Sequence, residues 1–151
     1  MKTLILAILL LFSSVSYSQK NYVCVGSGIF FNSPISDWKN TFGANIEYGR
    51  YLKSGIAVGV NFGYWSFLEG YQYNGLKITF PIVNKEHYCF SFSGGANYFY
   101  SFKDILLEYD LNGNIYISKD KTVSIALNYC RQSGLGYDRA ESFNFGINKD
   151  F

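Results

Sequence analysis

The stretch that decides the fold runs from Ile46 to Tyr64 and reads IEYGRYLKSGIAVGVNFGY. Beyond the polar turn at residues 53–55, every even position from Ile56 to Tyr64 carries a large apolar or aromatic side chain. The odd positions between them are small or polar: Ala57, Gly59, Asn61 and Gly63. Because successive side chains of a β-strand point to opposite faces, this period of two predicts two strands joined by a tight turn.

The same period recurs along the chain and predicts eight antiparallel strands. The segments that carry it are 22–31, 44–52, 56–64, 76–82, 88–98, 108–117, 123–130 and 142–151. Strands of about ten residues cross a bilayer when they are tilted. The sixth segment contains Asn112-Gly113, which is a strong hairpin signal. We expect one continuous strand with a bulge at Gly113, and a turn there is the alternative that would change the strand count.

Short polar connections alternate with longer ones. The short connections are 53–55, 83–86 and 119–121, and the longer ones are 32–41, 66–74, 101–107 and 131–141. Short turns at one end and long loops at the other are typical of outer-membrane barrels. We therefore expect an all-β, eight-stranded antiparallel up-and-down transmembrane β-barrel with both termini on the short-turn side, the periplasm.

The chemistry of the two faces favours a membrane over water. A soluble sheet shows charged side chains on its polar face, whereas here that face is Gly, Ser, Asn, Thr and Ala, and only 16% of the chain is charged. Aromatic residues near strand ends are expected to form interfacial girdles: Tyr48, Tyr64, Tyr98, Tyr129, Phe143 and Phe151. Eight strands leave a lumen that side chains fill, so no open pore is expected. A secreted soluble β-barrel that binds a hydrophobic ligand is the alternative.

The N-terminal residues have the layout of a cleavable signal peptide. Lys2 precedes an apolar run at 4–12, and Ser16 and Ser18 occupy the −3 and −1 positions before Gln19. Residues 1–18 are therefore predicted to be removed, which leaves 19–151 as one barrel domain. Three cysteines and one histidine supply neither a zinc ligand set nor a disulfide framework, so no cofactor and no metal is expected; a single disulfide pair stays open. The 13 basic and 11 acidic residues form no basic cluster, which argues against nucleic-acid binding.

The stretch Ile46–Tyr64 resembles a strand–turn–strand unit of small outer-membrane β-barrels, in particular the PorT-like barrels common in Bacteroidota, which are similar to OmpA/OmpX-type barrels. The last strand resembles the C-terminal signal read by the barrel-assembly machinery, with Phe143, Phe145, Ile147 and Phe151. This resemblance implies a bacterial outer-membrane protein of the cell envelope, with outer-membrane lipid around it and the assembly machinery as a partner during biogenesis. It implies no activity, because such families share architecture while their roles vary.

Four charged residues point into the lumen by strand parity and form the candidate polar network: Glu47, Lys77, Glu108 and Asp110. Buried charges need partners, so we predict that Glu47 or Asp110 pairs with Lys77. The segment 110–114 does not fit a calcium loop, because its glycine falls at the fourth place and the twelfth position is Lys121.

No catalytic residue is predicted. His87 follows a short turn, and one histidine at the periplasmic end makes no catalytic triad. We expect a non-enzymatic protein with a structural or surface-interaction role, acting through loops 66–74 and 131–141; a lipid-modifying barrel enzyme is the alternative. Residues in the predicted loops that could contact a partner or glycan are Trp38, Phe67, Tyr71, Tyr73, Tyr137 and Arg139.

Overall fold

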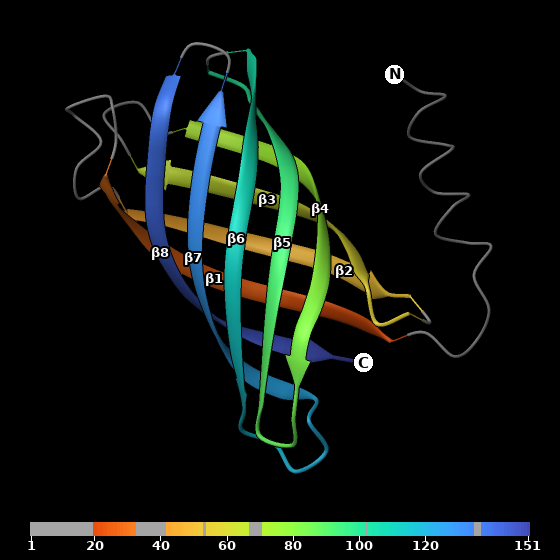
Figure 1. Ribbon diagram of the computed structural model, residues 1–151. Helices are drawn as coiled ribbons and strands as arrows, with labels where there is room; N and C mark the ends of the chain where they lie inside the picture. Colours follow the sequence, from red (N-terminus) through yellow and green to blue (C-terminus); the bar gives the residue numbers. More distant parts are fainter. Residues whose placement is uncertain (1–19, 33–41, 53, 67–70, 102, 135–136) are drawn as a thin grey trace.

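The computed structural model describes residues 20–32, 42–52, 54–66, 71–101, 103–134 and 137–151, and these form eight antiparallel strands in chain order (Figure 1). The strands are β1 Asn21–Asn32, β2 Phe42–Tyr51, β3 Ala57–Ser66, β4 Tyr71–Asn84, β5 Tyr88–Phe99, β6 Asp104–Tyr116, β7 Val123–Gly134 and β8 Tyr137–Asp150. The predicted fold class is confirmed. The predicted signal peptide at 1–18 lies outside the described residues.

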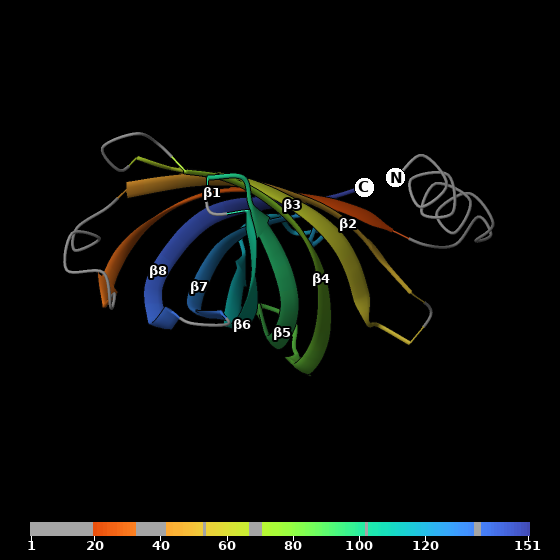
Figure 2. The same ribbon diagram turned by 90° about the horizontal axis from the view of Figure 1, so that it is seen from above.

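The sheet closes on itself because β8 pairs with β1. The register runs from Tyr22 opposite Asp150 to Asn32 opposite Glu141, and two backbone hydrogen bonds join Asn21 to Phe151 beyond it. In Figure 1, β5, β6 and β7 run from top to bottom at the front while β1, β2 and β3 cross behind them, and Figure 2 shows the same strands curving round from above. Closure leaves no strand edge unpaired, which is the condition for a sheet in lipid.

Both chain ends of the barrel lie at one end, which we call the termini end. The connections 52–56, 85–87 and 117–122 share that end with Asn21 and Phe151, and the connections 33–41, 67–70, 100–103 and 135–136 lie at the opposite end, the far end. The predicted length asymmetry is wrong, since only 33–41 exceeds the turns of the termini end. Residues expected in the loops 66–74, 101–107 and 131–141 belong largely to strands, so loop length does not indicate orientation.

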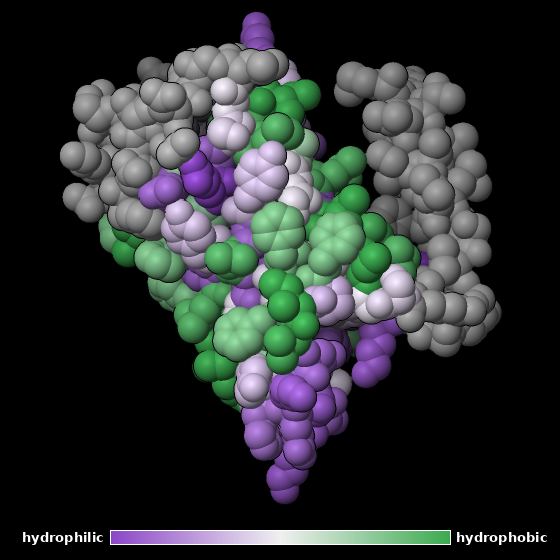
Figure 3. All heavy atoms as spheres, viewed as in Figure 1, coloured by the Kyte–Doolittle hydropathy of each residue, from purple (hydrophilic) through white to green (hydrophobic). Residues whose placement is uncertain are grey.

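The two faces of the sheet are distributed as predicted. Phe62 is 52% exposed on the outside of β3, whereas Asn61 beside it is 2% exposed in the lumen. Ser93 is likewise buried inside. Figure 3 shows hydrophobic residues spread over the middle of one face of the barrel and hydrophilic residues gathered at its lower tip. Within the described residues, no helix is long and apolar enough to cross a membrane.

The strand β6 passes through Asn112-Gly113 without a turn, as predicted. Its register with β5 and β7 is unbroken there, so the expected bulge at Gly113 is wrong. The Asn112 side chain bonds to neighbours in the lumen, and Gly113 faces outward beneath the ring of Phe90. These contacts fix an extended backbone and override the local hairpin preference. The register shifts lie instead at Phe30/Asn32, Pro81/Val83 and Gln132/Gly134.

Candidate functional site

The lumen is built in layers, which follow one another along each strand. On β4, the inward-facing side chains include, from the far end to the termini end, Tyr73, Lys77 and Thr79. On β6 the matching order is Leu106, then Glu108 and Asp110, then Asn112. The layers are thus an aromatic plug, a charge cluster and a ladder of amide and hydroxyl groups.

The aromatic plug closes the lumen towards the far end. It consists of Trp65, Tyr73, Phe99, Leu106 and Ala140, all at most 6% exposed. The ring of Tyr73 stacks on that of Phe99 at 5.0 Å and on that of Trp65 at 6.5 Å between centroids. Such stacking adds to the burial energy of each ring. The plug fills this part of the lumen with side chains.

The charge cluster surrounds the ammonium of Lys77. Its Nζ lies 3.1 Å from Glu47 Oε2, 3.0 Å from Glu108 Oε1 and 2.8 Å from Asp110 Oδ2. Both predicted ion pairs are therefore present, and Glu108 joins as a third partner. All four residues are buried, with exposures between 1% and 9%. Ion pairs at such positions must be fully hydrogen-bonded to offset the loss of water.

Two glycines make room for Lys77. The residues directly opposite it in the sheet are Gly59 on β3 and Gly95 on β5, so the long side chain and its three partners meet in space that larger neighbours would fill. The same row continues to Gly49, where an added methyl group would collide with the ring of Tyr22.

Uncharged side chains donate further hydrogen bonds to two of the three carboxylates, those of Glu47 and Glu108. Tyr22 donates its hydroxyl proton to Glu47 Oε1 at 2.5 Å. Asn97 and Gln132 both donate amide protons to Glu108 Oε2, at 2.5 and 3.0 Å. Charge-assisted bonds of this kind are roughly twice as strong as neutral ones. The cluster is therefore held from β1, β5 and β7 as well as by Lys77 itself.

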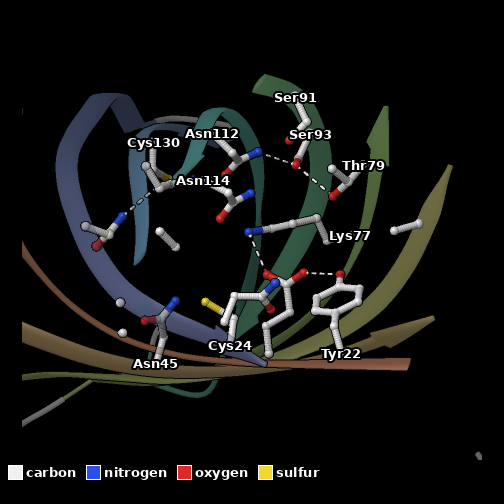
Figure 4. A pocket seen from close by; sticks show the side chains of 18 of the residues that line it. Tyr22, Cys24, Asn45, Lys77, Thr79, Ser91, Ser93, Asn112, Asn114 and Cys130 are labelled. Atoms are coloured by element: carbon white, nitrogen blue, oxygen red, sulfur yellow. Dashed lines mark hydrogen bonds and ion pairs between the residues drawn. The ribbon is translucent and has the colours of Figure 1, made fainter. Parts of the chain in front are cut away.

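The amide ladder crosses five strands on the termini side of the cluster. Asn144 donates to Asn128 at 2.9 Å, Asn128 to Asn112 at 2.5 Å, and Asn112 to Ser93 at 2.7 Å. Ser93 in turn bonds with Thr79 at 2.8 Å. Figure 4 shows Asn112, Ser93 and Thr79 of the ladder pointing into the lumen together with Lys77 and Tyr22. The ladder satisfies amides that would be costly to bury unpaired.

A cavity of about 120 Å³ lies between the ladder, the cluster and the termini end. Its lining includes Glu47, Lys77 and Glu108 from the cluster, and Gly55 from an exposed turn of the termini end. All three cysteines also line it as free thiols: Cys24, Cys89 and Cys130. The cavity therefore connects the charged groups with the solvent side of the termini end.

Several sequence expectations need correction at the far end. Tyr71 and Tyr73 lie on β4 rather than in a loop, and Tyr73 is buried in the plug. Tyr137 and Arg139 fall within the bounds of β8, whereas Trp38 and Phe67 lie outside the described residues. His87 is exposed in the turn between β4 and β5, on the termini end as expected. Parity places the four charged residues inside, and the same rule places Tyr22, Asn97 and Gln132 inside as well, although the residue types of these three did not mark them as members of the cluster.

Comparison with known proteins supports the fold and goes no further. No family model matches the chain, and no curated protein matches it by sequence. Among solved structures, the N-terminal β-barrel domain of OprF from Pseudomonas aeruginosa is similar with a TM-score of 0.67 at 10% identity, over 87% of this chain and 97% of that one. Neisserial surface protein A is similar with a TM-score of 0.60 at 9% identity, over 89% and 98%. The outer membrane protein Ail of Yersinia pestis, solved in a phospholipid bilayer nanodisc, is similar with a TM-score of 0.61 at 12% identity, over 89% and 100%.

Packing around Tyr22 gives a first testable prediction. Gly49→Ala should destabilise the barrel by about 1–3 kcal/mol, because the new methyl group must push the Tyr22 ring away from Glu47. Gly94→Ala is the matched control, since a methyl group at Gly94 meets nothing within 4 Å. Urea unfolding of the refolded barrel measures both variants. Equal stability of Gly49→Ala and the wild type would contradict the packing described for Tyr22.

Proposed function

We propose that this chain is an integral, non-enzymatic β-barrel of a bacterial outer membrane with a structural or surface-interaction role. The observation that carries the proposal is the outer face, where large apolar side chains are exposed on every strand. Those at least half exposed include Val25, Phe42, Phe62, Leu76, Phe90, Ile105, Leu111, Leu127, Phe143 and Ile147. Soluble proteins rarely expose apolar patches larger than a few hundred Å², whereas a lipid-facing barrel requires them.

The lumen supports a role that does not depend on transport. The plug closes one end, and the charge cluster and the amide ladder hold the centre with direct side-chain bonds. An enzyme acting on lipids of the outer leaflet would need a general base at the end of the barrel that meets that leaflet. His87 is instead exposed in a turn of the termini end, which we propose to be periplasmic. These features favour a scaffold over a channel or an enzyme.

The finer expectations of the sequence remain part of this proposal. They are membership of the PorT-like barrels of Bacteroidota, termini on the periplasmic side, outer-membrane lipid as surroundings, and recognition by the barrel-assembly machinery. The residues of the proposed C-terminal signal share the outer face of the last strand and the chain end and are 57–61% exposed: Phe143, Phe145, Ile147 and Phe151. Their common orientation leaves them accessible to an assembly factor before lipid covers them.

Arginines placed at two different depths distinguish a membrane barrel from a soluble one. Leu111 lies near the middle of β6 and is 56% exposed, and Ile117 lies just beyond the strand and is 59% exposed. In lipid vesicles, Leu111→Arg should cost about 2–4 kcal/mol and Ile117→Arg about 0–1 kcal/mol, because the penalty for a charge rises towards the bilayer midplane. Urea titration measures the difference. Equal tolerance of both arginines would favour the secreted soluble barrel.

Fractionation tests the location itself. The protein should stay with the envelope fraction after a carbonate wash and should migrate differently on gels before and after boiling, since a closed barrel resists unfolding by detergent without heat. Recovery in the soluble fraction would overturn the proposal. Lipid hydrolysis or acyl transfer that is lost in His87→Ala would favour the lipid-modifying alternative.

A further inference from the structure

The charge cluster carries more negative than positive charge. Glu47, Glu108 and Asp110 supply three carboxylates, and Lys77 supplies one ammonium. If all are ionised, the difference of two negative charges equals the charge of one divalent cation. A buried excess of this size is costly unless it is neutralised.

Four potential metal ligands lie together on the two strands at one side of the cluster. Glu108 on β6 stands opposite Gln132 on β7, and Asp110 stands opposite Cys130. One donor atom from each of Glu108, Asp110 and Cys130 lies within 4.8 Å of the other two, and all three residues are buried. Ligands of one zinc ion lie about 2.0–2.3 Å from the metal, so only a small inward movement of these side chains would bring them to a common ion. We call these four residues the β6–β7 quartet.

Gln132 provides an independent indication of a missing partner. Its Nε2 donates to Glu108 Oε2, which fixes the orientation of the amide because the opposite orientation would set oxygen against carboxylate. Its Oε1 is then left buried without a hydrogen-bond partner, and the residue is only 2% exposed. A buried amide oxygen of this kind calls for a donor or a cation.

We propose that the β6–β7 quartet binds one divalent metal ion of the borderline class, such as Zn²⁺, through Glu108, Asp110, Cys130 and the amide oxygen of Gln132. The set of oxygen and sulfur donors suits such an ion better than Ca²⁺ or Mg²⁺, which take oxygen ligands alone. Binding through sulfur releases the thiol proton, which leaves through the cavity. With the metal bound, the three carboxylates, the thiolate and the ammonium leave one net negative charge in place of two. The donors come in two pairs, Glu108 with Asp110 and Cys130 with Gln132, and the register between β6 and β7 brings the pairs together.

The cavity gives the ion a route to the quartet. Glu108, Cys130 and Gln132 all line it, and its lining continues to Gly55 in the turn at the termini end. The ion would enter from that end, because the aromatic plug fills the other side. The proposed metal site does not rest on the proposed membrane location, since it needs only the closed barrel.

Metal titration of the folded mature chain in detergent micelles tests the proposal. Zn²⁺ binding is measured by calorimetry, and Co²⁺ is added as an optical probe because sulfur ligation produces a charge-transfer band. We expect one ion for each barrel and a sulfur band with Co²⁺. Cys130→Ser should remove the band and weaken Zn²⁺ binding at least about tenfold.

A second cysteine in the same cavity supplies the matched control. Cys24 lines the cavity but stands opposite Glu47 and Asn148, outside the quartet, so Cys24→Ser should leave the stoichiometry and the band unchanged. Heat-dependent gel mobility shows whether each variant is folded. If Cys130→Ser does not fold, Asp110→Asn tests the same site and should also weaken Zn²⁺ binding. No saturable binding by the wild type, or equal losses in Cys24→Ser and Cys130→Ser, would overturn the proposal.

Discussion

Lys77→Met is expected to destabilise the barrel by about 3–5 kcal/mol, since it leaves three buried carboxylates without their cation. The side chain of Met fills a similar volume, so the loss reports charge rather than packing. Urea unfolding in lipid vesicles or micelles, without added metal, measures the change through the folded fraction on unboiled gels. Lys85→Met is the matched control, because Lys85 is exposed in a turn and its loss should change stability by less than about 0.5 kcal/mol.

Neutralising the carboxylates together with Lys77 should recover most of that loss. The variant that combines Lys77→Met with Glu47→Gln, Glu108→Gln and Asp110→Asn removes every charge from the cluster while it keeps the shapes. Replacement of a buried ion cluster by neutral groups is often nearly neutral in stability, whereas removal of one partner is not. If Lys77→Met alone matched the wild type, the ammonium would not be what compensates these carboxylates.

Phe99→Ala is expected to cost about 3–5 kcal/mol, because Phe99 is fully buried at the centre of the plug and stacks on Tyr73. The loss combines the transfer of the ring with the cavity that it leaves within the plug. Urea unfolding again gives the magnitude. Phe99→Leu keeps most of the volume and should lose clearly less. Similar free energies of unfolding for Phe99→Ala and the wild type would mean that the plug does not stabilise the barrel.

The strand faces were predictable from sequence because lipid imposes a strict rule on the middle of each strand. Ile78 and Phe80 face outward and Lys77 and Thr79 face inward on β4, as their parity requires. In the far-end part of β4 the distribution of polar and apolar residues is reversed. Gln72 is exposed and Asn74 also faces outward by parity, while Tyr71 and Tyr73 pack inside the lumen. Because the sequence analysis expected apolar side chains outside and polar ones inside, it predicted a loop at 66–74, where β4 in fact begins at Tyr71.

The candidate site was only partly predictable for a related reason. Parity brought Glu47, Lys77, Glu108 and Asp110 to one face, and any charge in so narrow a lumen must find a partner. Which neutral groups reach them depends on register and on gaps opposite glycines, such as Gly95 beside Lys77. Gln132 reaches Glu108 because the register between β6 and β7 places the two residues opposite each other. A single sequence does not specify this register.

Because the plug fills the lumen on one side only, the barrel has a cavity that opens at the termini end. Its three thiols all face the lumen, and Cys24 and Cys89 are partly exposed there, so a small, charged maleimide that does not cross lipid can reach these two only from the compartment into which the termini end opens. A comparison of labelling in intact cells and in broken envelopes would then report the orientation of the barrel in the membrane, with cysteines that the chain already carries.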